Sequence, residues 1–270
     1  MPGAAKVSSL MLRQTVVLSV LFSTSVVSFA QTAKNLAYGQ YSIISENGKS
    51  ERQLDSWTLE QDDEGNYLVK VSPGAAPANG AHIVQEFGFL PKFVPISYAL
   101  KATAPALEPG SKERLIHVDC KLGEKKVNCA ANFEGDASAA AIDVATPYLF
   151  FPGEFYGLDF PWFLAGVANQ AKAQAGATTE FAVTMLDDSK DDPLKIALKF
   201  DKQQSVAYLG REDITVLHRK IGARKFKTSE GTTIWLSDTG LLLAFQFADS
   251  ASRVELAQYE RLAAGAPELR

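Results

Sequence analysis

The sequence predicts a mainly β protein: one large antiparallel curved sheet or incomplete barrel with one central amphipathic helix. Many short segments alternate apolar and polar residues, and turns rich in Gly, Asn and Asp separate them. Only one segment has apolar residues at helical spacing. We therefore expect an export signal over 1–30 and a single β-rich domain over 31–270.

The first thirty residues have the features of a secretory signal peptide. They contain Lys6 and Arg13 and no acidic residue, and the run 15–30 is apolar apart from serines and threonines. Ser28 and Ala30 complete the A-x-A-like end that signal peptidase requires. A membrane anchor would need about 20 strongly apolar residues. We predict cleavage after Ala30 and export to the periplasm or the extracellular space.

The mature chain is expected to be mildly acidic. Loss of Lys6 and Arg13 leaves 25 basic against 31 acidic residues, a net charge of −6. This balance argues against a nucleic-acid partner, because such proteins carry a basic excess. No later apolar run is long enough to span a membrane, so we predict no transmembrane segment after signal removal. The sequence does not indicate the oligomeric state.

The first half of the domain, 36–145, is predicted to be a meander. Asn47-Gly48 and the polar loop 62–66 separate its first strands, and N-G is a typical hairpin turn. The expected strands are 38–45, 50–61, 67–72, 81–89, 93–102, 114–122, 127–133 and 140–145.

The two cysteines of the chain, Cys120 and Cys129, are predicted to staple one hairpin of this meander. If Leu122 pairs with Val127, the next pair on the same face is Cys120 with Cys129. A slip by one residue would turn every apolar side chain of this face outward. In an exported protein such a pair is expected to be a structural disulfide. Two thiolates would supply only half of a tetrahedral metal site, and no redox C-x-x-C is present.

The central segment 147–174 interrupts the strand pattern and is rich in aromatic residues. Eight of the sixteen residues of 148–163 are aromatic. Asp159 is a typical helix N-cap and Pro161 fits the first turn. Apolar residues then recur at i, i+3, i+4, i+7 and i+11 from Phe160. We predict one helix from about Phe160 to Gln174.

This segment is the predicted ligand-binding site. One interpretation is that the helix only fills the core beneath the sheet. The other is that it forms a wall or lid of an apolar cavity, as at the mouths of barrels. The predicted ligand-binding residues are Phe151, Phe155, Tyr156, Phe160, Trp162, Phe163 and Val167.

The second half, 178–262, resumes the meander. Its expected strands are 180–186, 194–200, 205–210, 213–219, 223–228, 232–237, 241–248 and 254–261. The acidic turn 187–192 lacks the glycine and distal glutamate of a calcium loop, so we interpret it as a solvated turn. Arg219, Lys220, Arg224, Lys225 and Lys227 form a basic cluster, which we expect on a protected edge strand rather than at a lipid or polysaccharide site.

No catalytic residue, metal site or cofactor is predicted. Asp238-Thr239-Gly240 matches the D-T-G of aspartic proteases, but it lies where a hairpin turn favours these residues. The histidines show no metal-ligand spacing. His117 and Asp119 share the outer face of the disulfide hairpin, where we expect a surface pair.

The closing meander resembles those of secreted bacterial β proteins of uncharacterised function and, more distantly, the lipoprotein-carrier (lipoprotein-localisation) group. The matching elements are Gly222-Ala223-x-Lys225, Ile234-Trp235-Leu236-Ser237, the turn 238–240 and Leu241-Leu242. The resemblance implies an incomplete barrel closed by helices over an apolar cavity. The carriers have several lid helices, whereas this sequence predicts one.

From the sequence we expect a non-enzymatic exported protein that binds an apolar or lipid-like ligand in a curved sheet covered by the helix. One alternative is an envelope scaffold or assembly protein without a small-molecule ligand. Another is a hydrolase whose site carries no recognisable motif.

Overall fold

The fold was analysed in a computed structural model, which describes residues 33–72, 82–104, 114–152, 159–188 and 196–269. The predicted signal peptide lies outside these ranges. The described elements are β1 (Lys34–Ile44), β2 (Ser50–Gln61), β3 (Tyr67–Ser72), β4 (His82–Leu90), η1 (Pro91–Phe93), β5 (Val94–Ala104), β6 (Arg114–Leu122), β7 (Lys126–Phe133), β8 (Asp136–Asp143), β9 (Tyr148–Phe151), α1 (Asp159–Gln170), β10 (Thr178–Asp188), β11 (Ile196–Val216), β12 (Arg219–Thr228), β13 (Thr233–Leu236), β14 (Leu242–Gln246) and β15 (Arg253–Arg261).

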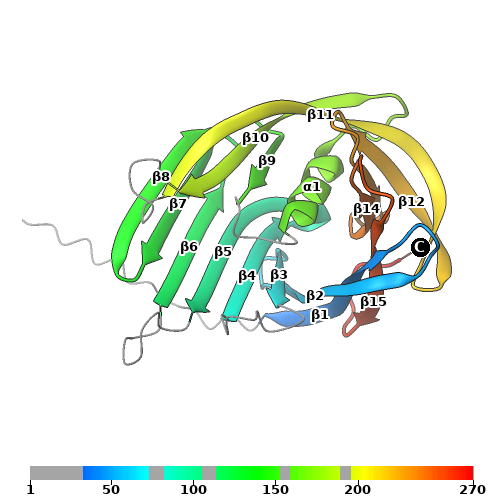
Figure 1. Ribbon diagram of the computed structural model, residues 1–270, viewed down its shortest axis with the longest axis horizontal. Helices are drawn as coiled ribbons and strands as arrows, with labels where there is room; N and C mark the ends of the chain where they lie inside the picture. Colours follow the sequence, from blue (N-terminus) through cyan, green and yellow to red (C-terminus); the bar gives the residue numbers. More distant parts are fainter. Residues whose placement is uncertain (1–32, 73–81, 105–113, 153–158, 189–195, 270) are drawn as a thin grey trace, which may run out of the picture. The chain divides into compact units, whose positions relative to one another are not determined.

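The described strands form one curved sheet that does not close, as predicted (Figure 1). Its order is β8-β7-β6-β5-β4-β3-β2-β1-β15-β14-β13-β12-β11-β10-β9. Strands that follow one another in sequence pair in the sheet, except that β8 and β9 lie at its two opposite edges. The pairing of β1 with β15 joins the two meanders. Pairing is antiparallel apart from β9 with β10, which are parallel because the chain crosses over through α1 between them.

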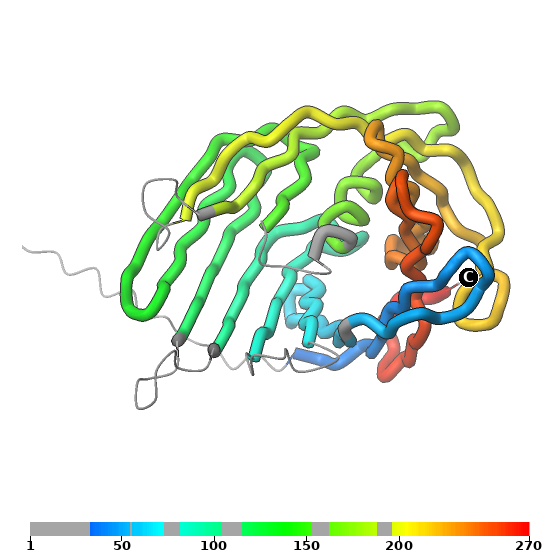
Figure 2. The backbone as a smooth tube through the Cα atoms, in the orientation of Figure 1, coloured from blue at the N-terminus to red at the C-terminus, as the bar shows by residue number. Residues whose placement is uncertain are grey.

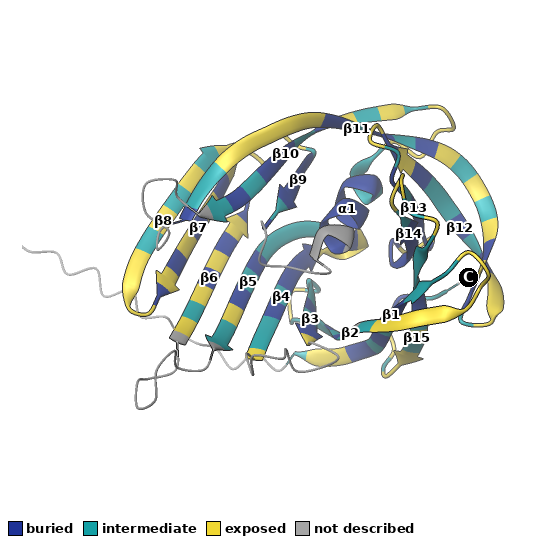
Figure 3. Cartoon of the chain, viewed as in Figure 1, coloured by how far each residue is buried: buried dark blue, intermediate teal, exposed yellow. Residues whose placement is uncertain are grey.

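The disulfide hairpin has the register that the alternating pattern predicts. Leu122 lies opposite Val127, and Cys120 lies opposite Cys129 with an S–S distance of 2.01 Å. The apolar face of both strands is buried and the polar face is exposed, as the alternation of colours along β6 and β7 shows (Figure 3). The predicted structural disulfide is therefore confirmed.

Helix α1 is the single α-helix among the described residues, and it ends four residues before the predicted Gln174. The backbone N–H of Lys172 approaches the hydroxyl of Thr179 at 3.4 Å instead of continuing the helical ladder. Gly176 then adopts a φ of +79° in the turn that leads into β10. The helix stops because this short connection must return the chain to the sheet.

Helix α1 lies within the curve of the sheet (Figures 1 and 2), and an aromatic core surrounds it. Trp162 packs edge-on against Trp57, with ring centroids 5.3 Å apart, and Phe163 packs against Phe150 at the same distance. The other large side chains of this core are Tyr41, Phe87, Phe89, Phe93 and Tyr98. They come from β1, β4, η1 and β5, and therefore the first meander forms most of the surroundings of the helix.

Gly166 permits the close approach of α1 to this part of the sheet. A Cβ at this position would lie 2.7 Å from Cδ of Pro95 and 3.0 Å from the carbonyl oxygen of Phe93. Such distances are below van der Waals contact, so a larger residue would push the helix away from β5.

The distal half of the β11–β12 hairpin extends beyond the rest of the sheet. Strand β12 pairs with β11 along its whole length, but with β13 only from Arg224 to Lys227. The apolar residues of the extended part are nevertheless buried: Ile214, Val216 and Ile221 are at most 5% exposed. The hairpin curls toward β15, which it contacts. The extended part of this hairpin therefore covers a part of the sheet near β15.

Candidate ligand-binding site

The predicted site residues that the structure describes belong to the aromatic core. Trp162, Phe163 and Val167 are at most 2% exposed. Phe151 is half-buried and packs against the same core. Phe155 and Tyr156 lie outside the described residues, as does the side chain of Phe160, although Phe160 itself falls within α1. The helix face that carries these residues is covered by side chains of the surrounding strands.

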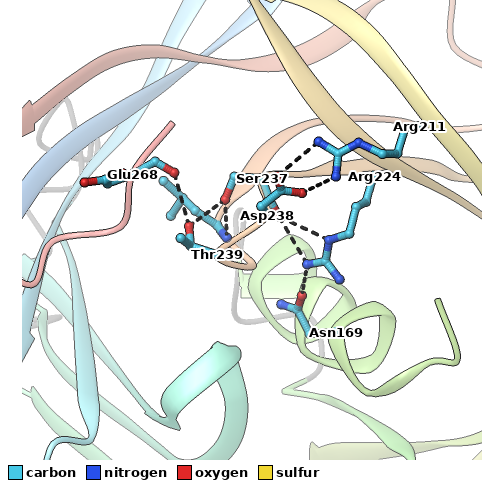
Figure 4. A network of polar contacts seen from close by, with 8 residues as sticks. Asn169, Arg211, Arg224, Ser237, Asp238, Thr239 and Glu268 are labelled. Atoms are coloured by element: carbon cyan, nitrogen blue, oxygen red, sulfur yellow. Dashed lines mark hydrogen bonds and ion pairs between the residues drawn. The ribbon is translucent and has the colours of Figure 1, made fainter. Parts of the chain in front are cut away.

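A network of hydrogen bonds connects the C-terminal end of α1 to the second meander (Figure 4). The guanidinium of Arg224 donates to Oδ1 of Asn169 at 2.7 Å and to the carbonyl oxygen of Ser237 at 3.1 Å. Asn169 in turn donates to the carbonyl oxygen of Gly240 at 2.9 Å. Burial lowers the pKa of Arg224. This arginine acts as a cationic cap near the C-terminus of the helix, where the helix dipole favours positive charge.

The D-T-G tripeptide forms the turn between β13 and β14. The N–H of Gly240 donates to the carbonyl oxygen of Ser237, and the N–H of Ser237 donates to that of Leu241. The carboxylate of Asp238 pairs with Arg211 rather than with a second carboxylate (Figure 4). Hydrogen bonding by Arg211 lowers the pKa of Asp238. The tripeptide thus has the turn role that the sequence predicts.

We expect Arg224→Met to destabilise the domain by about 2 kcal/mol, because it leaves Oδ1 of the partly buried Asn169 without its donor and removes two hydrogen bonds to the carbonyl oxygen of Ser237. Arg211→Met removes only an exposed ion pair, and should cost less than about 1 kcal/mol. Urea unfolding of both variants at pH 7 measures the difference.

The Arg211 effect should also depend on pH. Because the folded-state pKa of Asp238 is depressed, its pair stabilises the fold at neutral pH and the contribution disappears as pH falls through that pKa. Equal costs for the two arginine variants would contradict the assigned role of Arg224.

A cleft of about 640 Å³ lies where three hairpins meet. These are the ends of the β1–β2, β11–β12 and β14–β15 hairpins. Its apolar lining includes Ile44, Val216, Leu217 and Leu256. Its polar lining includes Ser42, His218, Gln246, Arg253 and Glu255. The volume falls within the range of about 300–1,000 Å³ that is typical of small-molecule sites.

The cleft lies on the opposite face of the sheet from the helix. Consecutive residues of a strand point to opposite faces. Tyr41 contacts Trp162 of α1, with ring centroids 6.1 Å apart, and the next residue, Ser42, lines the cleft. The hydroxyl of Tyr41 donates to the carbonyl oxygen of Leu242 at 2.9 Å, and burial raises its pKa, so it stays a neutral donor. The cleft and the helix are therefore separated by the sheet itself.

The floor of the cleft carries a fixed ion pair. Nε of Arg253 donates to Oε1 of Glu255 at 2.7 Å, and Nη2 contacts the same oxygen. The guanidinium carbon lies 5.4 Å from the ring centroid of Trp235, a cation–π contact. In the β1–β15 ladder, Ser42 is the partner of Glu255, and Ile44 is the partner of Arg253. A hydroxyl, a carboxylate and a guanidinium thus lie side by side.

Trp235 is itself held in place by a charged partner. Its indole N–H donates to Glu212, which also accepts from Nζ of Lys225 at 2.9 Å. Burial acts to raise the pKa of Glu212, but the two hydrogen bonds and the positive charges of Lys225 and Arg253 together outweigh burial and lower the pKa. The Glu212 carboxylate is therefore ionised at neutral pH, and it supports the ring on which Arg253 rests.

A second cavity, of about 450 Å³, lies on the outer face of the disulfide hairpin. It is lined by the exposed alanines Ala130, Ala139 and Ala141 and by the ends of Asp119 and Lys121. Its walls contain no buried polar side chain among the residues described, so it lacks a placed group that could orient a ligand.

The remaining sequence candidates have structural partners. His117 and Asp119 form the expected exposed pair at 3.0 Å. Strand β12, which carries the basic cluster, lies between β11 and β13, so the expected edge position is wrong for Arg224, Lys225 and Lys227. Arg219 and Lys220 lie in the part of β12 that pairs with β11 but not with β13. Most of the acidic turn 187–192 lies outside the described residues. Within the described part of the chain, no group of three or more His, Cys, Asp or Glu could hold a metal ion.

The sequence did not predict the residues of the cleft as site residues. Ser42, Arg253 and Glu255 come from the first and last strands, and only the β1–β15 pairing brings them together. The one local signal is the spacing of Arg253 and Glu255, which places both side chains on one face of a strand.

These features define the class of molecule: a β-barrel-like protein whose curved sheet encloses a helix and bears a cleft on its other face. No protein-family model matches the chain, and no curated protein matches it. Among solved structures, it is similar to a beta-barrel-like protein of the domain of unknown function DUF1849 from Brucella abortus, with a TM-score of 0.39 and 9% sequence identity. The match covers 85% of this chain and 99% of that one. Among the described residues, no helix combines the length and apolar character needed to cross a membrane.

Proposed function

We propose that this protein is an exported, non-enzymatic binding protein, and that it holds an apolar or lipid-like ligand in the cleft between the three hairpins. The observation that carries the proposal is the cleft itself, which combines about 640 Å³ of space with a lining that is apolar on one part and polar on another. Export is supported by the signal-like N-terminus and by the disulfide, since disulfides persist in oxidising compartments.

The packing of the helix favours the cleft over the aromatic segment as the ligand site. Trp162 and Phe163 contact aromatic rings of five strands and of η1. A ligand there would have to displace close-packed side chains, which is costly in a core of native density. The cleft needs no such displacement.

The same packing supports a second candidate, an envelope scaffold without a small-molecule ligand. Native mass spectrometry of the purified mature chain distinguishes the two candidates. A co-purifying amphiphile supports the binding protein. A ligand-free protein that also fails to take up added amphiphile supports the scaffold.

We expect Ile44→Trp to weaken binding of a neutral apolar dye, N-phenyl-1-naphthylamine, at least about tenfold, because the indole would occupy the cleft that Ile44 lines. Ile43→Trp is the matched control. It makes the same change at the adjacent residue, which points to the other face and does not line the cleft.

Fluorescence titration measures dye binding, and thermal unfolding shows that both variants are folded. Ile43→Trp should bind the dye within about twofold of the unmodified protein. Equal effects of the two variants, or none in either, would place the dye site outside the cleft and overturn the proposal.

A further inference from the structure

The polar floor of the cleft indicates which kind of headgroup its ligand carries, an inference that rests on the proposed function. Ser42 is 2% exposed, yet among the residues that the structure describes its hydroxyl makes no hydrogen bond. This hydroxyl is not one of the fully buried groups of the described residues that lack a partner, so it carries no penalty in the free protein; it borders the cleft, where a ligand group can pair with it. Ser42 lines the cleft, so its hydroxyl is available to a bound molecule.

The ion pair beside Ser42 offers both a donor and an acceptor. Both hydrogen bonds from Arg253 end on Oε1 of Glu255, which leaves Oε2 without a partner among the described residues. Nη1 of Arg253 likewise has no partner among them. The side chain of Glu255 is 12% exposed and that of Arg253 is 30% exposed. The floor of the cleft therefore presents an acceptor, a donor and a hydroxyl next to one another.

The balance of charge at this floor disfavours an ionised headgroup. A carboxylate or phosphate on Arg253 would lie beside Glu255, and an ammonium on Glu255 would lie beside Arg253. Either ligand charge would lose water and gain a like charge as a neighbour. The other charged group nearby, Glu212, is already paired with Lys225 and Trp235. Glu46 and His218 lie at the exposed rim, where solvent screens them.

We infer that the ligand is a neutral amphiphile whose head carries hydroxyl groups, such as a monoacylglycerol. A hydroxyl both donates and accepts, so one head can donate to Oε2 of Glu255 while it accepts from Arg253. A second hydroxyl can pair with Ser42. The apolar chain lies against Ile44, Val216 and Leu217. The cleft should therefore prefer the neutral ligand, because an anionic ligand would lie beside Glu255 and a cationic ligand beside Arg253.

Displacement of the neutral dye by three amphiphiles with the same twelve-carbon chain tests this inference. The probes are 1-monolauroylglycerol, laurate and dodecylammonium, each below its micelle concentration. We expect monolauroylglycerol to bind the unmodified mature protein at least about tenfold more tightly than either ion, about 1.4 kcal/mol.

Two changes that each remove one charge should alter the preference in opposite directions. Glu255→Gln leaves Arg253 uncompensated and should favour laurate at least about tenfold relative to the neutral probe. Arg253→Met leaves Glu255 uncompensated and should favour dodecylammonium in the same way. Glu51→Gln is the control, because it makes the carboxylate-to-amide change on β2 at a residue that does not line the cleft. It should leave the order of the three probes unchanged.

The outcomes separate this inference from the proposed function. If an ion displaces the dye from the unmodified protein as well as monolauroylglycerol does, or if Glu255→Gln and Arg253→Met leave the order unchanged, the headgroup assignment is wrong. The Ile44→Trp result then still supports a ligand in the cleft. If no probe displaces the dye and Ile44→Trp has no effect, both are overturned.

Discussion

Replacement of Gly39 by alanine is expected to destabilise the domain by about 3 kcal/mol, at the upper end of the usual cost of overpacking. A Cβ on Gly39 would lie 2.1 Å from Cζ2 of Trp57, its partner on β2. The indole lies flat across the glycine, so its ring, and not a flexible chain end, would have to move.

Trp57 has little room to move away. It is 2% exposed, and its ring centroid lies 5.3 Å from that of Trp162 and 6.1 Å from that of Tyr259. Its indole N–H is buried without a hydrogen-bond partner among the described residues. Packing alone therefore fixes this ring, and the packing depends on the absence of a side chain at Gly39.

A double-mutant cycle measured by urea unfolding tests this explanation. In a Trp57→Leu background the smaller side chain should reduce the cost of Gly39→Ala to less than about 1 kcal/mol. Gly222→Ala is the control, because a Cβ there would meet only the ends of two flexible side chains, Nη2 of Arg211 at 3.3 Å and Oδ1 of Asp213 at 3.9 Å. A Gly39→Ala cost that is unchanged by Trp57→Leu would show that the glycine is required for another reason.

The part of the fold that could be predicted is the part that local pattern determines. Alternation over nine or ten residues specified the register of Cys120 against Cys129, because one slip would turn the whole apolar face outward. The turn at Asp238 followed from residue preferences of the same short range. The end of α1 did not, since Ala171 to Gln174 have helical preferences and the return to β10 overrides them.

The candidate site could be predicted only in part because it depends on long-range pairing. The many aromatic residues of 148–163 correctly indicated that this segment differs from the strands around it. The pattern within the segment does not show which side chains of β1, β4 and β5 pack against it. Tyr41 and Ser42 illustrate the difficulty. They are adjacent in sequence, yet one contacts the helix and the other lines the cleft. Only the pairing of β1 with β15 identifies the second face as a site.

Replacement of Trp162 by alanine is expected to lower the free energy of unfolding by about 3–5 kcal/mol. Its indole is 2% exposed and contacts rings of β1, β2, β4 and η1, so truncation leaves a large cavity at the centre of the aromatic core. For a domain of this size the melting temperature should fall by roughly 10 °C. Differential scanning calorimetry measures this change.

The same variant separates the two candidate ligand sites. If the ligand occupies the cleft, Trp162→Ala should leave dye affinity within about twofold at a temperature where the variant is folded, because the sheet lies between them. Trp235→Ala is the matched tryptophan change on the cleft side. It removes the ring on which Arg253 rests, so it should weaken binding of monolauroylglycerol more than Trp162→Ala does. If Trp162→Ala instead abolishes dye binding in a folded protein, the ligand lies against the helix, as the aromatic residues of the sequence predict.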